Sequence, residues 1–91
     1  MNNVDPLKID DCDDAIIGIA SRCGQVPLLV YDRSKLVQCF VDQGMSVDDA
    51  DEWVSFNVEG AWMGEGTPII FNQMSPEESL DFIGDCCSIN E

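Results

Sequence analysis

The stretch VPLLVYDRSKLVQCFVDQGMS (residues 26–46) decides the predicted fold, because a strand pattern is followed in it directly by a helix pattern. Residues 28–31 are apolar and rich in strand-forming side chains, so we expect a short strand there. Asp32 or Ser34 can act as the N-cap of the following helix, and Gly44 marks its end. One face of this helix consists of apolar residues at helical spacing: Leu36, Val37, Phe40 and Val41.

The residues before this stretch predict an irregular arm over residues 1–10 and then a helix beginning at Asp11 or Asp13. Acidic residues gather in the first turn of the expected helix, where the helix dipole favours negative charge. Gly24 suits the helix end. The apolar residues of this helix at the spacing of one face are Ile16, Ile17, Ala20 and Cys23.

The residues after this stretch predict two further helices and a second strand. Ser46, followed three residues later by an acid, approximates a capping box and begins the first of these helices. Residues 69–71 form the expected strand, and Ser75-Pro76 begins the last helix. The expected buried stripe of the first helix is Val47, Ala50, Val54, Val58 and Ala61. The inward residues of the last helix are Leu80, Ile83 and Cys87.

Together these patterns predict one small α+β domain over residues 11–91, with the element order α-β-α-α-β-α. The two short strands would pair into a sheet on which the helices pack. A length of 91 residues and a hydrophobic content of 45% fit one domain with a small core. No apolar run approaches the roughly 20 residues of a membrane-spanning helix, and the acidic N-terminus does not resemble a secretory signal.

The charge is strongly negative and unevenly distributed. Eighteen Asp and Glu residues, four Lys and Arg residues and no His give a formal net charge of −14. Residues 1–44 carry seven acids and four bases (net −3), whereas residues 45–91 carry eleven acids and no base (net −11). This balance excludes nucleic-acid wrapping, which needs a Lys/Arg footprint, and disfavours binding to an anionic membrane. The absence of histidine excludes histidine bases, triads and metal ligands.

The five cysteines are odd in number and include no C-x-x-C pair, so neither a disulfide framework nor a zinc site is expected. We expect reduced thiols, most of them small core residues. A nucleophilic cysteine would need a base that this chain lacks, and so short a chain leaves little room for a substrate cleft. We therefore predict a protein without enzymatic activity, cofactor or bound metal.

Acidic clusters are the candidate sites. The run DDCDD (residues 10–14) fits a charged helix N-terminus or a contact for a basic partner, and it lacks the glycine and distal Glu of a calcium loop. Asp81 and Asp85 are like charges four residues apart without a compensating base, which a solvated helix face explains poorly. The candidate partner-binding acids are Asp48, Asp49, Asp51 and Glu52 in the third helix and Glu77, Glu78, Asp81 and Asp85 in the last helix.

Such carboxylates, held on a rigid surface, can occupy a groove built for phosphates, so mimicry of nucleic acid is the function that we expect from them. A solvated acidic surface and a generally acidic host proteome are the alternatives. Core packing is the simplest role for the aromatic and Met-rich group, with Trp53 or Trp62 as the candidate interface anchor. The members of that group are Trp53, Phe56, Trp62, Met63 and Phe71.

The glycine-rich segment GAWMGEGTP (residues 60–68) lacks the lysine of a P-loop, so it favours turn formation over phosphate binding. Its backbone amides and Thr67 leave contact with a small anion open.

Several motifs lie between residues 14 and 71: A-I-x-G with a later C-G, V-Y-D, G-M-S-x-[DE]-[DE]-A, F-N-x-x-G-A and G-E-x-T-P. They occupy residues 15–18, 23–24, 30–32, 44–50, 56–61 and 64–68. This set resembles a family of small uncharacterised acidic bacteriophage proteins over about two-thirds of the chain, and the last helix lies outside it. The resemblance implies a phage product made in the bacterial cytoplasm, and it transfers no catalytic residue. By analogy of class, small acidic phage proteins include anti-CRISPR and anti-restriction inhibitors.

The leading hypothesis is a phage-encoded, non-enzymatic inhibitor that binds a basic, nucleic-acid-handling host protein or defence complex, such as a CRISPR effector. One alternative is a sponge for a nucleotide immune signal, which would need Arg22, Arg33 and Lys35 to converge on the glycine-rich segment. Another is an accessory or virion protein without an inhibitory role. We expect neither nucleic acid nor a membrane as a direct partner, and homo-oligomerisation is left open.

Overall fold

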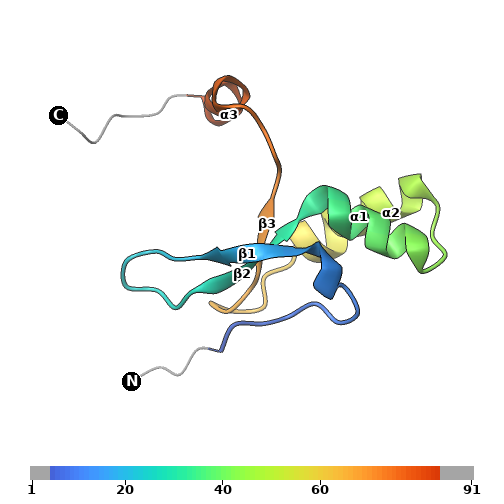
Figure 1. Cartoon of the computed structure of the whole chain (residues 1–91), viewed down its shortest axis with the longest axis horizontal. Coiled ribbons are helices and arrows are strands. Elements are labelled where there is room, and N and C mark those ends of the chain that lie inside the picture. Colours follow the sequence, from blue (N-terminus) through green and yellow to red (C-terminus); the bar gives the residue numbers. More distant parts are fainter. Residues whose placement is uncertain (1–4, 85–91) are drawn as a thin grey trace.

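The computed structural model describes residues 5–84, which form an α+β fold, the class that the sequence predicts (Figure 1). The bounds of the elements, in chain order, are the 3₁₀ turn η1 (Asp13–Ala15), β1 (Ile16–Ala20), β2 (Leu28–Asp32), α1 (Arg33–Asp42), α2 (Val47–Trp53), the π-helical segment η2 (Val54–Glu59), β3 (Ile69–Phe71) and α3 (Pro76–Ile83). The predicted strands at residues 28–31 and 69–71 are confirmed, and so are the helix starts at Ser46 and Ser75.

The sheet has three strands in the order β1-β2-β3, where the sequence predicted two. β1 and β2 form an antiparallel hairpin, and β3 lies parallel to β2 on its other side. Two parallel neighbours need a crossover connection, and here α1, α2 and η2 provide it. Asp32 begins the crossover: its side chain accepts a hydrogen bond from the Lys35 amide at 3.1 Å. Of the two predicted caps for α1, Asp32 and Ser34, it is therefore Asp32 that caps the helix.

The prediction of a helix from Asp11 or Asp13 to Gly24 is wrong, because residues 16–20 form β1 and only η1 is helical before them. Gly18 sits beside a β-bulge with a φ of 152°, a conformation that other residues rarely adopt. The β-branched isoleucines around it fit a pleated strand better than a helix. The element order from β1 onward is therefore β-β-α-α-β-α.

The core is formed by side chains from β2, α1 and η2 and from the segment of η1 with the residue before it. Tyr31 is fully buried in it, and its hydroxyl accepts a hydrogen bond from the Ile9 amide at 2.9 Å. The predicted stripe of the third helix is confirmed at Ala50 and Val54, which are buried, but is wrong at Val47, which is 63% exposed. The buried hydrophobic residues are Cys12, Ala15, Tyr31, Leu36, Ala50 and Val54. This core is small, as expected for the chain length.

α3 stands apart from the rest of the fold, at the end of an extended segment that follows β3 (Figure 1). None of its residues is buried, so the prediction that Leu80 and Ile83 face inward is wrong. Cys87, the third residue of that predicted face, lies outside the described residues. The apolar spacing of a helix predicts that a face will be covered, but it does not identify the covering surface.

The N-terminal segment crosses the glycine-rich segment in close backbone contact. The amide of Leu7 donates a hydrogen bond to the carbonyl oxygen of Gly66 at 2.9 Å, and Gly66 is buried. A Cβ on Gly66 would lie 2.2 Å from the backbone oxygen of Asp5. Close approach of two backbones therefore explains this glycine, and a bound ligand is not needed to account for it.

We expect Gly66→Ala to detach the N-terminal segment and to lower the free energy of unfolding by about 1–3 kcal/mol, because the added methyl group overpacks the crossing. Trypsin should then cleave after Lys8 faster than it does in the original chain. Glu65→Ala, a change at the exposed neighbouring position, is the matched control and should leave the cleavage rate unchanged. Equal rates in the two variants would contradict this account of Gly66.

Candidate functional site

The acidic cluster of α2 lies mostly on the exposed side of that helix. Asp48, Asp49 and Glu52 are exposed and form no ion pair among residues 5–84. Ser46 caps the helix by accepting a hydrogen bond from the Asp49 amide at 3.1 Å. Asp48 and Asp49 lie in the first turn of α2, where the helix dipole stabilises acids, so these two carboxylates can persist without a neighbouring cation. They are available to a partner.

Asp51, the fourth predicted acid of α2, is engaged within the fold by Arg33. Arg33 Nη1 lies 2.7 Å from Asp51 Oδ1, and Nε lies 2.8 Å from Glu59 Oε1. Arg33 also donates to Ser55 Oγ at 2.6 Å. The hydrogen bonds with Glu59 and Asp51 raise the pKa of the Arg33 guanidinium. No local spacing in the sequence links residue 33 to residues 51–59, so this network was not predicted.

The predicted acids of α3 divide in the same way. Ser75 and Glu78 form a capping box: the Glu78 amide donates to Ser75 Oγ, and the Ser75 amide donates to Glu78 Oε1, both at 3.1 Å. The hydrogen bond from the Ser75 amide lowers the pKa of the Glu78 carboxyl. Glu77 and Asp81 are exposed and unpaired among the described residues. Asp85 lies outside those residues, so the predicted Asp81/Asp85 pair stays a prediction.

The two tryptophans lie in different surroundings. Trp53 is 45% exposed and tilts against Phe40 with a ring separation of 6.4 Å, and it lines a shallow hollow of about 220 Å³ with Asp49 and Glu52. Trp62 is 76% exposed and lines a separate groove. The expectation of core packing is wrong for the whole aromatic and Met-rich group, because all its members are exposed: Trp53, Phe56, Trp62, Met63 and Phe71.

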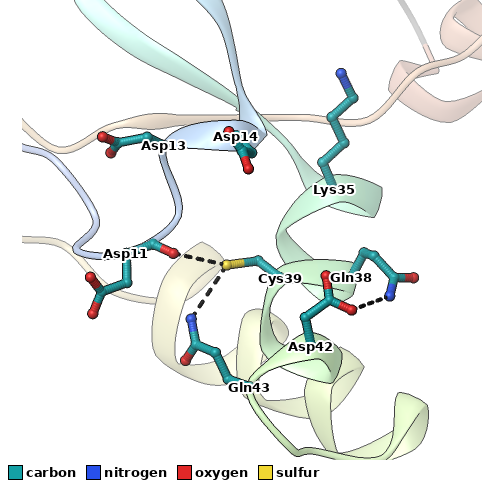
Figure 2. A pocket seen from close by; sticks show the side chains of 8 residues that line it. All are labelled: Asp11, Asp13, Asp14, Lys35, Gln38, Cys39, Asp42 and Gln43. Carbon is teal, nitrogen blue, oxygen red and sulfur yellow. Dashed lines mark hydrogen bonds between the residues drawn. The ribbon is translucent and has the colours of Figure 1, made fainter.

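The prediction that the acidic run at residues 10–14 begins a helix is wrong. Asp11, Asp13 and Asp14 of this run instead line an open groove beside α1 (Figure 2). Asp11 has a positive φ of 64°, and only the short turn η1 follows it. The volume of the groove is about 510 Å³. Its lining residues are Asp11, Asp13, Asp14, Lys35, Gln38, Cys39, Asp42 and Gln43. No group of side chains within residues 5–84 is arranged to hold a metal ion.

Of the three basic side chains that the nucleotide sponge would need, only Arg22 lies against the glycine-rich segment. Arg33 is held by Asp51 and Glu59, Lys35 lines the acidic groove, and Arg22 lines the groove beside Trp62. Within the glycine-rich segment, Thr67 Oγ1 accepts a hydrogen bond from the Met63 amide at 2.8 Å and donates one to the Gly64 carbonyl at 2.6 Å. Internal hydrogen bonds therefore account for Thr67.

The apolar residues of α3 are candidate contact residues that were not predicted from the sequence, where Leu80 and Ile83 were expected to face inward. Leu80, Phe82 and Ile83 are 59%, 76% and 65% exposed, and they share the helix with Glu77 and Asp81. The sequence feature that could have indicated a contact surface is the apolar pattern on a helix that carries acids and no base. Uncovered apolar side chains of this size commonly mark a contact surface.

A scan against protein-family models and searches of curated proteins and of solved structures found no match to this chain. In the part of the chain that the structure describes, no helix is both long and apolar enough to cross a membrane.

Proposed function

We propose that this chain is a non-enzymatic binding protein, encoded by a phage, that inhibits a basic nucleic-acid-handling protein in the host bacterial cytoplasm. The observation that carries the proposal is α3: a capped helix that stands off the fold, with exposed apolar residues beside free carboxylates. Protein interfaces combine an apolar centre with a polar rim, and α3 offers both on one short helix. A defence complex such as a CRISPR effector is the class of target that we favour.

A second surface of the same composition supports the proposal. On α2, Trp53 is flanked by Asp49 and Glu52 around a shallow hollow that Phe56 also lines. Tryptophan is among the side chains that contribute most to interface affinity when a partner covers it. Figure 1 places α2 and α3 in separate parts of the fold, so a partner would meet two surfaces.

The charge determines the kind of partner. Within residues 5–84 only Asp13, Asp51 and Glu59 form ion pairs, so most carboxylates carry uncompensated negative charge. A surface lined by Lys and Arg would be attracted over several ångströms, and it is the kind of surface that also binds phosphates. The attraction must weaken with salt, because the screening length is about 10 Å at 0.1 M ionic strength and shorter above it.

The test is capture of a host partner by the tagged full-length chain from bacteria with intact defence systems, followed by a binding assay with the purified partner. We expect duplex DNA or RNA to compete with the chain for that partner. Raising the salt from 0.05 to 0.5 M should weaken binding at least tenfold. Retention of binding at high salt, together with no competition by nucleic acid, would overturn the proposal.

Matched charge variants locate the surface. Asp48→Asn with Asp49→Asn and Glu52→Gln removes three charges from α2, and we expect it to weaken binding more than tenfold. The control with the same net charge change is the triple variant D11N/D13N/D14N in the groove of Figure 2, and it should change affinity less than threefold. Equal effects of the two triple variants would mean that binding responds only to net charge.

The double variant Glu77→Gln with Asp81→Asn tests the acids of α3, and it leaves the capping box at Glu78 intact.

A further inference from the structure

Two cysteines that are distant in the sequence meet beside the open groove of Figure 2, which Cys39 lines. Cys12 precedes η1 and Cys39 lies in α1, and their sulfur atoms are 2.7 Å apart, without a bond between them. A disulfide has a sulfur–sulfur length of about 2.05 Å, so a closing movement of about 0.7 Å would join them. Cys23, the other described cysteine, is exposed in the β1–β2 hairpin and takes no part in this contact.

We propose that Cys12 and Cys39 form an intrachain disulfide when the protein meets a small disulfide oxidant such as oxidised glutathione. The pair would be a redox modification site that ties the segment before β1 to α1. The proposal does not depend on the inhibitor function and stands on the geometry of the two thiols.

The two sulfur atoms have different access to an oxidant. Cys12 is 1% exposed, whereas Cys39 is half-buried and lines the open groove (Figure 2). In that groove the Cys39 thiol donates to the Asp11 carbonyl at 3.2 Å, and Gln43 Nε2 lies 3.4 Å from Cys39 Sγ as a donor. The Gln43 amide can hydrogen-bond the sulfur as it gains negative charge. Cys39 is therefore the thiol that reacts first.

The disulfide forms in two thiol–disulfide exchange steps. Cys39, as its thiolate, attacks one sulfur of oxidised glutathione, forms a mixed disulfide and releases one glutathione thiolate, which takes up a proton. Cys12, after losing its proton, then attacks Cys39 Sγ and displaces the second glutathione. Two protein thiols are oxidised to one disulfide, and one oxidised glutathione is reduced to two glutathione molecules.

The second step is expected to be the slow one. Burial, the nearby Cys39 and the carboxylates of Asp11 and Asp13 raise the pKa of the Cys12 thiol to about 12, so little of it is ionised at neutral pH. Lys8, 3.4 Å from Asp13, offsets part of that negative charge. The other charged groups of the groove are Asp14, Lys35 and Asp42. The mixed disulfide on Cys39 should therefore accumulate before the internal disulfide forms, and raising the pH from 7 to 9 should speed its disappearance.

The test is oxidation of the full chain carrying Cys23→Ser, Cys86→Ser and Cys87→Ser, so that only the proposed pair can react. Peptide mapping by mass spectrometry should find residues 12 and 39 linked, with the loss of two hydrogen atoms. The oxidised form should melt roughly 10 °C or more above the reduced form, because the link closes a long loop. Thiols that stay free, or a glutathione adduct that never resolves into the internal link, would overturn the proposal.

Variants that keep only Cys12 or only Cys39, made in the same triple-serine chain, separate the two exchange steps. Cys12→Ala should stop at the glutathione adduct on Cys39, and Cys39→Ala should show no reaction within the time in which the pair closes, since Cys12 is buried. If Cys12→Ala does not fold, Cys39→Ala still tests the order of attack. Rapid glutathione addition to Cys12 in the folded Cys39→Ala variant would contradict the assignment of Cys39 as the entry point.

Discussion

Leu36→Ala is expected to remove more than half of the protein's free energy of unfolding at 25 °C. Leu36 is fully buried and is one of the few large side chains in the core. Truncating a buried leucine costs about 3–5 kcal/mol when the surroundings cannot collapse into the cavity. A domain with so small a core has about 5 kcal/mol of stability to lose. Urea titration followed by far-ultraviolet circular dichroism measures the effect.

Leu80→Ala on α3 is the matched control, because it removes the same atoms from a side chain that is 59% exposed. We expect it to change the free energy of unfolding by less than about 0.5 kcal/mol. A comparable loss in both variants would mean that α3 packs on the fold in solution and is covered there. The pair of variants therefore also tests the exposed position of α3 on which the proposed function depends.

The segment over residues 26–46 was predicted well because each of its signals is local. The apolar run of β2, the Asp32 cap and the helical spacing of α1 depend only on neighbours in the sequence. The caps at Ser46 and Ser75 are local in the same sense. When both partners of an interaction lie within a few residues of each other, the interaction can be predicted from the sequence alone.

β1 was missed because its apolar spacing fits a helix as well as a strand, and pairing with β2 decides between them. Most of the thiols were predicted to be small core residues; among the described cysteines Cys12 is buried, Cys39 is half-buried and Cys23 is exposed. The contact between Cys12 and Cys39 joins residues that no motif links. Long-range contacts also determine which of the predicted acids are engaged within the fold: Asp51 forms an ion pair with Arg33, which is 18 residues away.

Arg33→Gln is expected to lower the free energy of unfolding by about 1–3 kcal/mol, because it removes the guanidinium that bridges α1 to α2 and η2. The loss should be smaller than for a fully buried pair, because the side chains of Asp51 and Glu59 are 58% and 33% exposed and solvent screens the interaction. Glutamine has a helix propensity similar to that of arginine, so α1 itself should not be weakened. Chemical denaturation at low and high salt measures the loss.

Arg22→Gln is the matched control, because it removes the same charge from an arginine that forms no ion pair within residues 5–84. If net charge alone governed stability, the two variants would be equally destabilised and salt would rescue both equally. If the ion-pair network governs stability, Arg33→Gln should have the lower free energy of unfolding at every salt concentration.

A double variant tests the network directly. Combining Arg33→Gln with Asp51→Asn should lower the free energy of unfolding by less than the sum of the two single losses, because the second change removes a partner that is already lost. Additive losses would mean that Asp51 is as free for a partner as Asp48.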